Sequence, residues 1–269
     1  MKTIVLYCFH EYNGRVKQFI KTGIFKDPKV DFMVICNHPT LKVRVPSYVH
    51  YMNRENAGYD FGAWSDAVLD HDLVNKYDHF IFLNSSVSGP YTTEKWTDFF
   101  LKGLQGNIKL YGCTINAMAY PNANPKNKDP LYRSHVQSYL FCMDKKTLSF
   151  LIEKGIFSKT YVRGFRHAVI YKELLMSRYI IEKGWNIGSI LPYYQGVDFT
   201  FKTKKPNEYA NFLDDVMKPK YENRLWTKEQ LIFVKGNRIQ CKKDCKKTKR
   251  GVVHDTTPKT IRLPNYLKQ

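Results

Sequence analysis

Residues 2–36 read KTIVLYCFHEYNGRVKQFIKTGIFKDPKVDFMVIC and show the alternation that decides the fold. KTIVLYCF (2–9) is a short apolar run rich in β-forming residues, which predicts a buried strand. RVKQFIKTGIF (15–25) has apolar residues at helical spacing, and DFMVIC (31–36) predicts a second buried strand. A strand, a helix and a strand in this order favour parallel pairing of the two strands.

The same alternation continues along the chain. The patterns predict strands at residues 48–52, 79–83, 109–113, 136–143 and 186–194, and helices at residues 59–73, 93–104, 144–157 and 167–185. Thr93 and Asp144 are the expected N-caps of two helices, and Gly155 and Gly184 the expected ends of two. We therefore expect an α/β fold with a mostly parallel central sheet flanked by helices. In such sheets ligands bind at the carboxyl ends of the strands.

Composition agrees with one large folded domain. Of the 269 residues, 43% are hydrophobic and 15% aromatic, which excludes a disordered chain. Residues 117–133 are rich in proline and asparagine and predict a long loop. Residues 241–250 read CKKDCKKTKR and are followed by loop-like sequence. We expect a single domain over residues 1–240 and a basic, flexible tail over residues 241–269.

The chain is strongly basic. It has 43 Lys and Arg against 24 Asp and Glu, a net charge of +19. Nucleic acid, an anionic membrane and a phosphate-bearing substrate are the partners that such a charge suggests. The densest basic run lies in the tail and lacks aromatic residues, so we expect no nucleic acid partner.

The cysteines and the N-terminus predict a cytoplasmic protein. MKTIVLYCF is too short for a membrane span and no secretory signal follows it, so we expect no transmembrane segment. The sequence has six cysteines; Cys8, Cys36, Cys113 and Cys142 lie in apolar runs typical of reduced, buried thiols. Cys241 and Cys245 form a lone pair without further zinc ligands.

The loop at residues 54–64, RENAGYDFGAW, follows a predicted strand and opens a helix. Its glycines allow a close approach of backbone to a ligand, and a helix N-terminus favours anions. Asn56 can contact a nucleobase or ribose, and Asp60 a ribose hydroxyl or a metal ion. The alternative is that Asn56 and Asp60 only cap the helix. The absence of Gly-Lys-Ser/Thr excludes a phosphate loop of the P-loop type.

A second polar segment follows the strand at residues 79–83. The sequence HFIFLNSSVSGPY places Asn84, Ser85 and Ser86 at the predicted carboxyl edge of the sheet. Small side chains there would let a bulky ligand lie against the backbone. The alternative is an ordinary turn capped by Ser and Asn.

Together these motifs resemble a family of GT-A-like glycosyltransferases, with relatives that include rhamnan-synthesis-protein-F-type enzymes and other bacterial and viral polysaccharide glycosyltransferases. The resemblance spans residues 2–238. Its motifs are Asn56-x-Gly-x-Asp-x-Gly, Phe82-Leu-Asn-Ser-Ser-x-x-Gly-Pro, His135-Val-Gln-Ser-Tyr, Glu173 in a helix ending at Gly184, and EQLIFVKGNR (229–238). It implies a GT-A-like, Rossmann-related fold. The implied activity is sugar transfer from a UDP-, GDP- or dTDP-sugar to a glycan acceptor hydroxyl.

The resemblance also implies roles for the two halves of the domain. The donor half would span about residues 1–115 and the acceptor half about residues 116–240. The residues implied to bind the nucleotide sugar are Asn37, Arg54, Asn56, Gly58, Asp60, Asn84, Ser85 and Ser86. Many GT-A enzymes hold Mg²⁺ or Mn²⁺ with an Asp-x-Asp at the place of Asn84–Ser86, where this chain has no carboxylate. Either Asp60 or Asp198 holds the ion instead, or Arg and Lys side chains neutralise the diphosphate.

On the acceptor side, the resemblance implies contacts from His135, Gln137 and Ser138 and a catalytic base, Glu173. We expect inversion at the anomeric carbon, because inversion requires one base and Glu173 is available. The alternatives are a loop histidine at His135 and a surface charge at Glu173 that suits the helix dipole. A methyltransferase is the alternative enzyme, although Tyr7-Cys8-Phe9-His10 stands where such enzymes have a Gly-rich turn.

Overall fold

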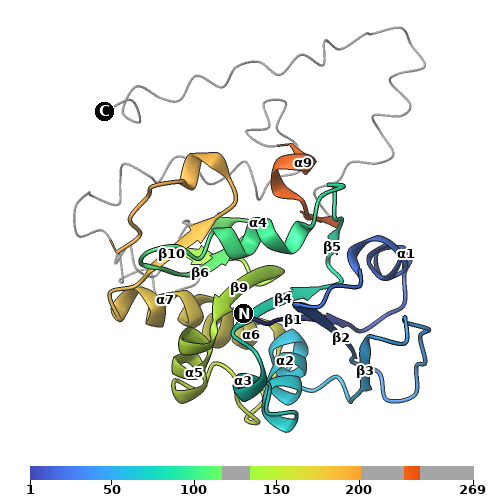
Figure 1. The fold of residues 1–269 in the computed structure, drawn as a ribbon. Coiled ribbons are helices and arrows are strands. Elements are labelled where there is room, and N and C mark those ends of the chain that lie inside the picture. The colour runs from blue at the N-terminus through green and yellow to red at the C-terminus, as the bar shows by residue number, and fades with distance from the viewer. Residues whose placement is uncertain (117–133, 201–226, 237–269) are drawn as a thin grey trace, which may run out of the picture.

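A computed structural model describes residues 1–116, 134–200 and 227–236. Its centre is a seven-stranded sheet in the order β10-β6-β9-β4-β1-β2-β3 (Figure 1). The strands of this sheet are β1 Thr3–Phe9, β2 Val30–Cys36, β3 His50–Asn53, β4 His79–Asn84, β6 Ile108–Gly112, β9 Leu140–Asp144 and β10 Asn186–Ser189. β9 is antiparallel to both of its neighbours, and the other pairs are parallel. The predicted mostly parallel sheet is confirmed.

Two short ribbons accompany the central sheet. β5 (Val87–Ser88) pairs antiparallel with β11 (Val234–Lys235), which lies far away in the sequence. β7 (Ile115–Asn116) pairs antiparallel with β8 (His135–Val136). The first ribbon therefore joins segments that are far apart in the sequence, and the second joins the two ends of the segment 117–134.

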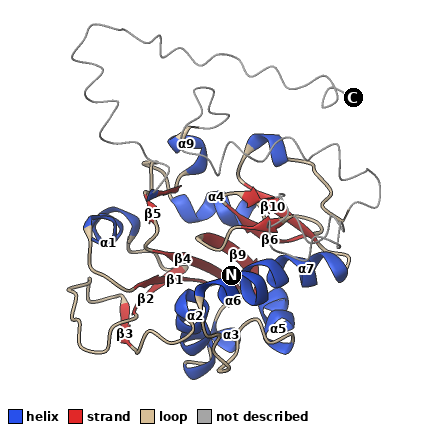
Figure 2. Cartoon of the chain, turned by 180° about the vertical axis from the view of Figure 1, so that it is seen from behind, coloured by secondary structure: helices blue, strands red, loops and turns tan. Residues whose placement is uncertain are grey.

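Helices cover both faces of the sheet (Figures 1 and 2). The helical segments are α1 Gly14–Gln18, the π-helical η1 Phe19–Gly23, α2 Tyr59–Asp70, α3 Leu73–Lys76, α4 Trp96–Lys102, α5 Lys145–Glu153, α6 Phe165–Ala168, the π-helical η3 Val169–Leu174, α7 Leu175–Glu182, the 3-10 turn η4 Pro192–Tyr194 and α9 Lys228–Leu231. The two faces of β1 show the two layers. Ile4, Leu6 and Cys8 belong to the cluster that includes α2, α3, α5 and α7. Val5 and Tyr7 belong to the cluster that includes α1 and α4. Burial on both faces is the reason that the central strands read as continuous apolar runs.

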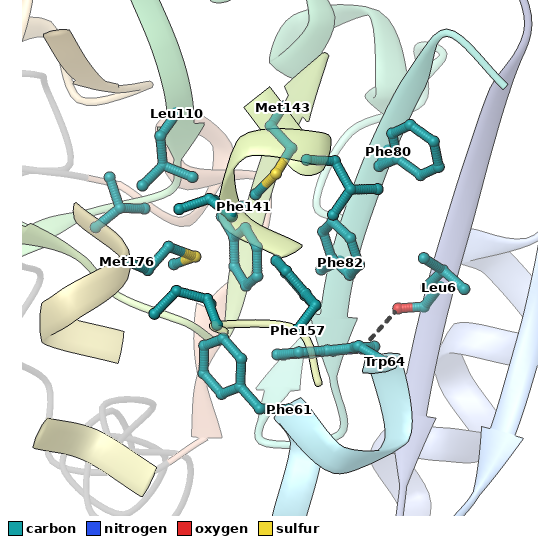
Figure 3. Close-up of a cluster of buried hydrophobic side chains, with 14 of the residues drawn as sticks. Leu6, Phe61, Trp64, Phe80, Phe82, Leu110, Phe141, Met143, Phe157 and Met176 are labelled. Atoms are coloured by element: carbon teal, nitrogen blue, oxygen red, sulfur yellow. Dashed lines mark hydrogen bonds between the residues drawn. The ribbon is translucent and has the colours of Figure 1, made fainter. Parts of the chain in front are cut away.

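An aromatic cluster packs α2 against strands β4 and β9 of the sheet (Figure 3). The rings of Phe82 on β4 and Phe141 on β9 stack with centroids 4.9 Å apart, and Trp64 of α2 meets Phe141 edge-on at 5.4 Å. The indole Nε1–H of Trp64 donates to the carbonyl of Leu6 at 3.2 Å. Burial of each such ring contributes about 2–3 kcal/mol. The cluster fixes where α2 begins at the carboxyl edge of the sheet.

Several predicted elements differ at their ends. The helix predicted over residues 59–73 ends at Asp70, because Asp72 has φ of +49° and a new short helix follows. The strand predicted over residues 136–143 is interrupted by a turn between β8 and β9. The strand predicted over residues 186–194 ends at Ser189, since the 3-10 turn η4 starts at Pro192, which lacks the N–H of a strand residue.

The helix caps were predicted with mixed success. Thr93 is not an N-cap: α4 starts at Trp96 after Lys95, with no side-chain cap. Asp144 does cap α5, because its carboxylate accepts from the backbone N–H of Thr147 at 2.7 Å. Gly184 ends α7 with φ of +80°, a left-handed conformation that favours glycine.

Some expectations lie outside the described residues. These are the loop at 117–133, the tail at 241–269 and the pair Cys241 and Cys245. The other four cysteines are buried and free, as expected of apolar strands. Within residues 1–116, 134–200 and 227–236, the helices are all too short or too polar to cross a membrane.

Candidate functional site

The carboxyl ends of β1 and β4 meet at the point where the strand order reverses. From β1 the chain continues to β2 on one side, whereas from β4 it leads toward β6 on the other. The register pairs Cys8 of β1 with Asn84, the last residue of β4. The loops that follow the two strands therefore diverge, and open α/β sheets bind ligands in the crevice at such a point.

Asp60, in the first turn of α2, lies at this edge of the sheet. Its carboxylate accepts from the side-chain amide of Asn84 at 2.7 Å and from the thiol of Cys8 at 3.2 Å. The N-cap of α2 is Gly58, with φ of +74° and no side-chain cap. The alternative in which Asn56 and Asp60 cap this helix is therefore wrong.

The surroundings of Asp60 make its ionised form unfavourable. Burial raises the pKa of this carboxyl, and the negative charge of Glu173 raises it further. The hydrogen bonds from Cys8 and Asn84 and the charge of Lys235 lower the pKa, but the net shift is upward. A carboxyl whose pKa is raised by its surroundings, at the sheet edge where ligands bind, is a candidate functional group.

Asn84, Ser85 and Ser86 form a compact turn after β4. The amide oxygen of Asn84 accepts from the backbone N–H of Ser86 at 3.0 Å and from its hydroxyl at 2.5 Å. The backbone N–H of Ser85 donates to the carbonyl of Cys8 at 3.0 Å, which ties the turn to β1. The side chain of Asn84 thus joins the end of β4 to α2 and to Ser86, and its amide oxygen accepts two hydrogen bonds from Ser86.

The side chains at this edge offer few ligands to a divalent cation. Asn84 and Ser86 are neutral, and the carboxylate bonded to them is that of Asp60 alone. Across the described ranges, no three His, Cys, Asp or Glu side chains gather as they do around a bound metal ion.

Asp198, the second expected metal ligand, lies elsewhere. Its carboxylate accepts from the backbone N–H and the hydroxyl of Thr200, at 2.9 and 2.6 Å. The neighbouring Phe199 bonds to Asn186, the first residue of β10. Since β10 runs in the same direction as β4, Asn186 lies at the opposite edge of the sheet from Asn84. The structure therefore does not bring Asp198 to Asp60.

Arg54 and Asn37 brace the loop before α2. The Arg54 guanidinium donates to Asp66 at 2.6 Å, to the Asn37 side-chain oxygen at 2.8 Å and to the carbonyl of Ala57 at 2.8 Å. The Arg54 side chain is only 8% exposed. A Cβ on Gly62 would lie 2.0 Å from the Ala57 carbonyl, so only glycine fits there. Arg54, Asn37 and Gly62 therefore fix the conformation of the loop, and a ligand would contact the exposed side chains of the loop instead.

His10, directly after β1, and Asn56, in the loop before α2, are exposed side chains that lie next to each other. The Nδ1 atom of His10 lies 3.0 Å from the carbonyl of Asn37 and 3.4 Å from the side-chain amide of Asn56. Both residues are exposed. His10 is a further candidate: it follows a buried strand directly, which is the same sequence signal that marks Asn84.

A second polar cluster joins His135, Ser138 and Glu173. The carboxylate of Glu173 accepts from the backbone N–H of Ser138 at 3.1 Å and from its hydroxyl. The Nε2 atom of His135 lies 3.4 Å from Glu173 Oε1. Gln137, by contrast, accepts from the hydroxyl of Thr114 at 2.7 Å. The structure thus brings together three of the four residues expected on the acceptor side.

Glu173 is not a surface charge. It lies in the π-helical segment η3, between α6 and α7, and its side chain is 17% exposed. Burial alone would raise the pKa of Glu173, but the hydrogen bonds and charge of His135 and the hydrogen bonds of Ser138 outweigh it, and the net shift is downward. Glu173 is therefore ionised at neutral pH.

Lys172 anchors the π-helical segment. Its buried ammonium donates to the carbonyls of Gly155 and Ile156 at 2.7 and 2.9 Å and to the hydroxyl of Ser158 at 3.3 Å. These partners belong to the turn after α5. A π-helical turn inside a helix is frequent at functional sites, and here it is tied to a second element beside Glu173.

Two basic residues flank the turn after β4. The Arg15 Nε–H donates to the carbonyl of Ser85 at 2.8 Å. On the other side, Lys235 of β11 pairs with Val87, and its ammonium lies 6.0 Å from the centre of the Tyr139 ring. Sequence reasoning named neither residue. The only signal for Lys235 is its place in EQLIFVKGNR, because its contacts are far away in sequence.

An open pocket of about 620 Å³ adjoins the loop before α2. Its lining comes from two segments, residues 56–59 and residues 160–164. Tyr59, which lines the pocket, is 38% exposed. Phe165, the residue after the second lining segment, is 68% exposed, and its ring meets that of Tyr59 edge-on with centroids 6.4 Å apart. Tyr59 has φ of +56°, an uncommon conformation for a bulky residue.

One comparison with known proteins gives a match that covers a large part of this site. A family model described as rhamnan synthesis protein F matches residues 39–213. The match includes the loop before α2, the turn after β4 and the cluster around Glu173. No curated protein matches this chain.

Proposed function

The chain belongs to the rhamnan synthesis protein F family, and from this premise we propose that it is a glycosyltransferase of polysaccharide biosynthesis. The donor is a nucleoside diphosphate sugar and the acceptor is a glycan hydroxyl. One observation carries the proposal: the hydrogen bond from Asn84 to Asp60, which joins two of the motifs at the point where the strand order reverses. A nucleotide needs polar groups at this edge of the sheet, and this pair provides them.

The donor would lie across the ends of β1 and β4. His10 and Asn56 are exposed there and have the hydrogen-bonding groups that a nucleobase or ribose needs. Asp60 accepts hydrogen bonds and suits a ribose hydroxyl. The small side chains of Ser85 and Ser86 leave room for the diphosphate beside the backbone. Asn37, Arg54 and Gly58 support this surface by shaping the loop.

Glu173 would act as the general base toward the acceptor. Its carboxylate is ionised and is held in place by His135 and Ser138. In the proposed step the acceptor oxygen forms a bond to the anomeric carbon while the bond from that carbon to the diphosphate oxygen breaks. The electron pair of the broken bond stays on the diphosphate, and the hydroxyl proton moves to Glu173. Attack opposite to the leaving group inverts the anomeric carbon.

The pocket rimmed by Tyr59 and Phe165 suits the acceptor. A pyranose ring has an apolar face of C–H groups that packs on aromatic rings, and hydroxyls at its edge that need polar partners. Exposed aromatic rings beside a polar pocket have both properties. The pocket adjoins α6, which continues directly into the segment that carries Glu173.

A thermal stability screen tests the proposal against its alternatives. The expected result is a higher melting temperature with UDP, GDP or dTDP, because a ligand that binds only the folded state stabilises it. S-adenosylmethionine and a single-stranded oligonucleotide should cause no such shift. A shift with S-adenosylmethionine alone would favour a methyltransferase, and a shift with the oligonucleotide alone a nucleic-acid-binding protein.

A further inference from the structure

Arg15 and Lys235 reach the turn after β4 from two distant parts of the chain. Arg15 donates to the carbonyl of Ser85, and Gly236, next to Lys235, donates its backbone N–H to the carbonyl of Ser86 at 2.7 Å. A Cβ on Gly236 would lie 3.0 Å from the Arg15 guanidinium, which shows how closely the two segments approach. The Arg15 side chain and the backbone next to Lys235 therefore both contact one turn, Asn84–Ser86.

A diphosphate bound beside this turn needs positive charge nearby during the reaction. When the bond from the anomeric carbon to the diphosphate breaks, the leaving oxygen gains a full negative charge, which a positive group must stabilise. The turn has no carboxylate to hold a divalent cation, and the amide oxygen of Asn84 already accepts from Ser86. The positive charge that neutralises the leaving group must therefore come from side chains next to the turn.

We propose that Arg15 and Lys235 neutralise the diphosphate of the donor in the place of a divalent cation. The inference rests on the proposed function and identifies the two side chains that do this work. Arg15 has a planar guanidinium that can donate two parallel hydrogen bonds to phosphate oxygens, and Lys235 has a point charge. A guanidinium and an ammonium both supply positive charge to a departing diphosphate.

Lys235 is placed by the pairing of β11 with β5. Its ammonium lies over Tyr139, whose backbone carbonyl accepts from the N–H of Asn84 at 3.1 Å. Lys235 also lies close enough to Asp60 to act on it electrostatically. The segment at residues 227–236 thus completes the donor site, although more than 140 residues separate it from the turn after β4.

Binding measurements on the whole chain test the inference. The probes are the nucleoside diphosphate among UDP, GDP and dTDP that stabilises the protein, and the matching nucleoside. Lys235→Met and Arg15→Met should each weaken diphosphate binding about tenfold or more, the usual effect of losing a charged hydrogen bond. Nucleoside binding should stay unchanged, and a chelator should not weaken diphosphate binding to the native protein.

Two comparison variants complete the experiment. Lys228→Met removes an exposed lysine of the same segment, and should bind the diphosphate as the native chain does. Lys235→Arg keeps the charge and should retain most of the affinity. Arg15→Met leaves β11 intact, so it tests the inference even if Lys235→Met disturbs that strand.

Two results would overturn the inference while leaving the proposed function intact. One is native-like diphosphate affinity in both Met variants. The other is loss of binding in chelator with recovery in Mn²⁺, which would show that a metal ion does this work. A native chain that binds none of the three diphosphates would instead contradict the proposed function itself.

Discussion

Asn84 donates its side-chain amide to the carboxylate of Asp60 at 2.7 Å, and this hydrogen bond joins the end of β4 to the first turn of α2. The same Asn84 side chain accepts from Ser86 and so shapes the turn after the strand. Burial raises the pKa of Asp60, so the carboxyl is held where its charge is unfavourable. A carboxyl that lies where its negative charge is unfavourable is a good candidate for ligand binding.

Asp60→Asn should separate binding from stability. Because the pKa of Asp60 is higher in the folded than in the unfolded chain, its contribution to stability is present at low pH and is lost as pH rises through the folded value. At neutral pH the variant should melt at the same temperature or higher, while nucleoside diphosphate affinity falls about tenfold. Asp70→Asn, at the exposed end of the same helix, is the control. A lower melting temperature with unchanged affinity would make Asp60 a structural residue.

Glu173→Gln should slow catalysis without weakening donor binding. Glutamine keeps the size and most hydrogen bonds of Glu173 but cannot accept the acceptor proton, so turnover should fall about 10²–10⁴-fold. Calorimetry should give a nearly native diphosphate affinity. Glu182→Gln, an exposed residue of α7 that pairs with Arg178, should retain turnover. Native turnover in Glu173→Gln would leave this residue a structural role.

The rate should depend on pH through Glu173 and Ser138. The pKa of Glu173 is lowered, so turnover should stay high as pH falls and decline only below the ordinary glutamate value of about 4.3. The stability due to this ionised group is likewise lost as pH falls through the folded pKa. Ser138→Ala removes a hydroxyl donor to the carboxylate and should move the decline to higher pH. An unmoved profile would separate Ser138 from the base.

Phe165→Ala should act on the acceptor alone. The ring of Phe165 is 68% exposed, so its removal should leave the melting temperature nearly unchanged. Loss of one aromatic face for a sugar should raise the KM for acceptor several-fold with little change in donor affinity. Tyr48→Ala removes an exposed aromatic ring elsewhere on the surface and should leave both constants unchanged. Weaker donor binding in Phe165→Ala would assign the pocket to the nucleotide.

The sheet could be predicted because its strands are buried on both faces and read as apolar runs. Asp144 and Gly184 also follow local rules, since a cap depends on neighbours within a few residues. The turn between β8 and β9 could not be predicted in this way. There the apolar pattern continues through Tyr139, which is buried in the turn by tertiary contacts.

The site could be predicted only where its residues belong to local sequence patterns. Asp60 lies at the start of one recognisable element and Asn84 at the end of another, and their positions at the sheet edge follow from the topology. From the sequence, Arg54 is expected to contact the ligand. In the structure its guanidinium forms an ion pair with Asp66 instead. Lys235 depends on pairing between β5 and β11, a contact that no local pattern contains.

The most direct measurement is a crystal structure of the complex with the nucleoside diphosphate that stabilises the protein most. The diphosphate should lie within hydrogen-bonding distance of the turn Asn84–Ser86, and the nucleoside should contact His10, Asn56 or Asp60. A nucleotide bound only in the pocket beside Phe165, or at the opposite edge of the sheet, would contradict the account of the donor site.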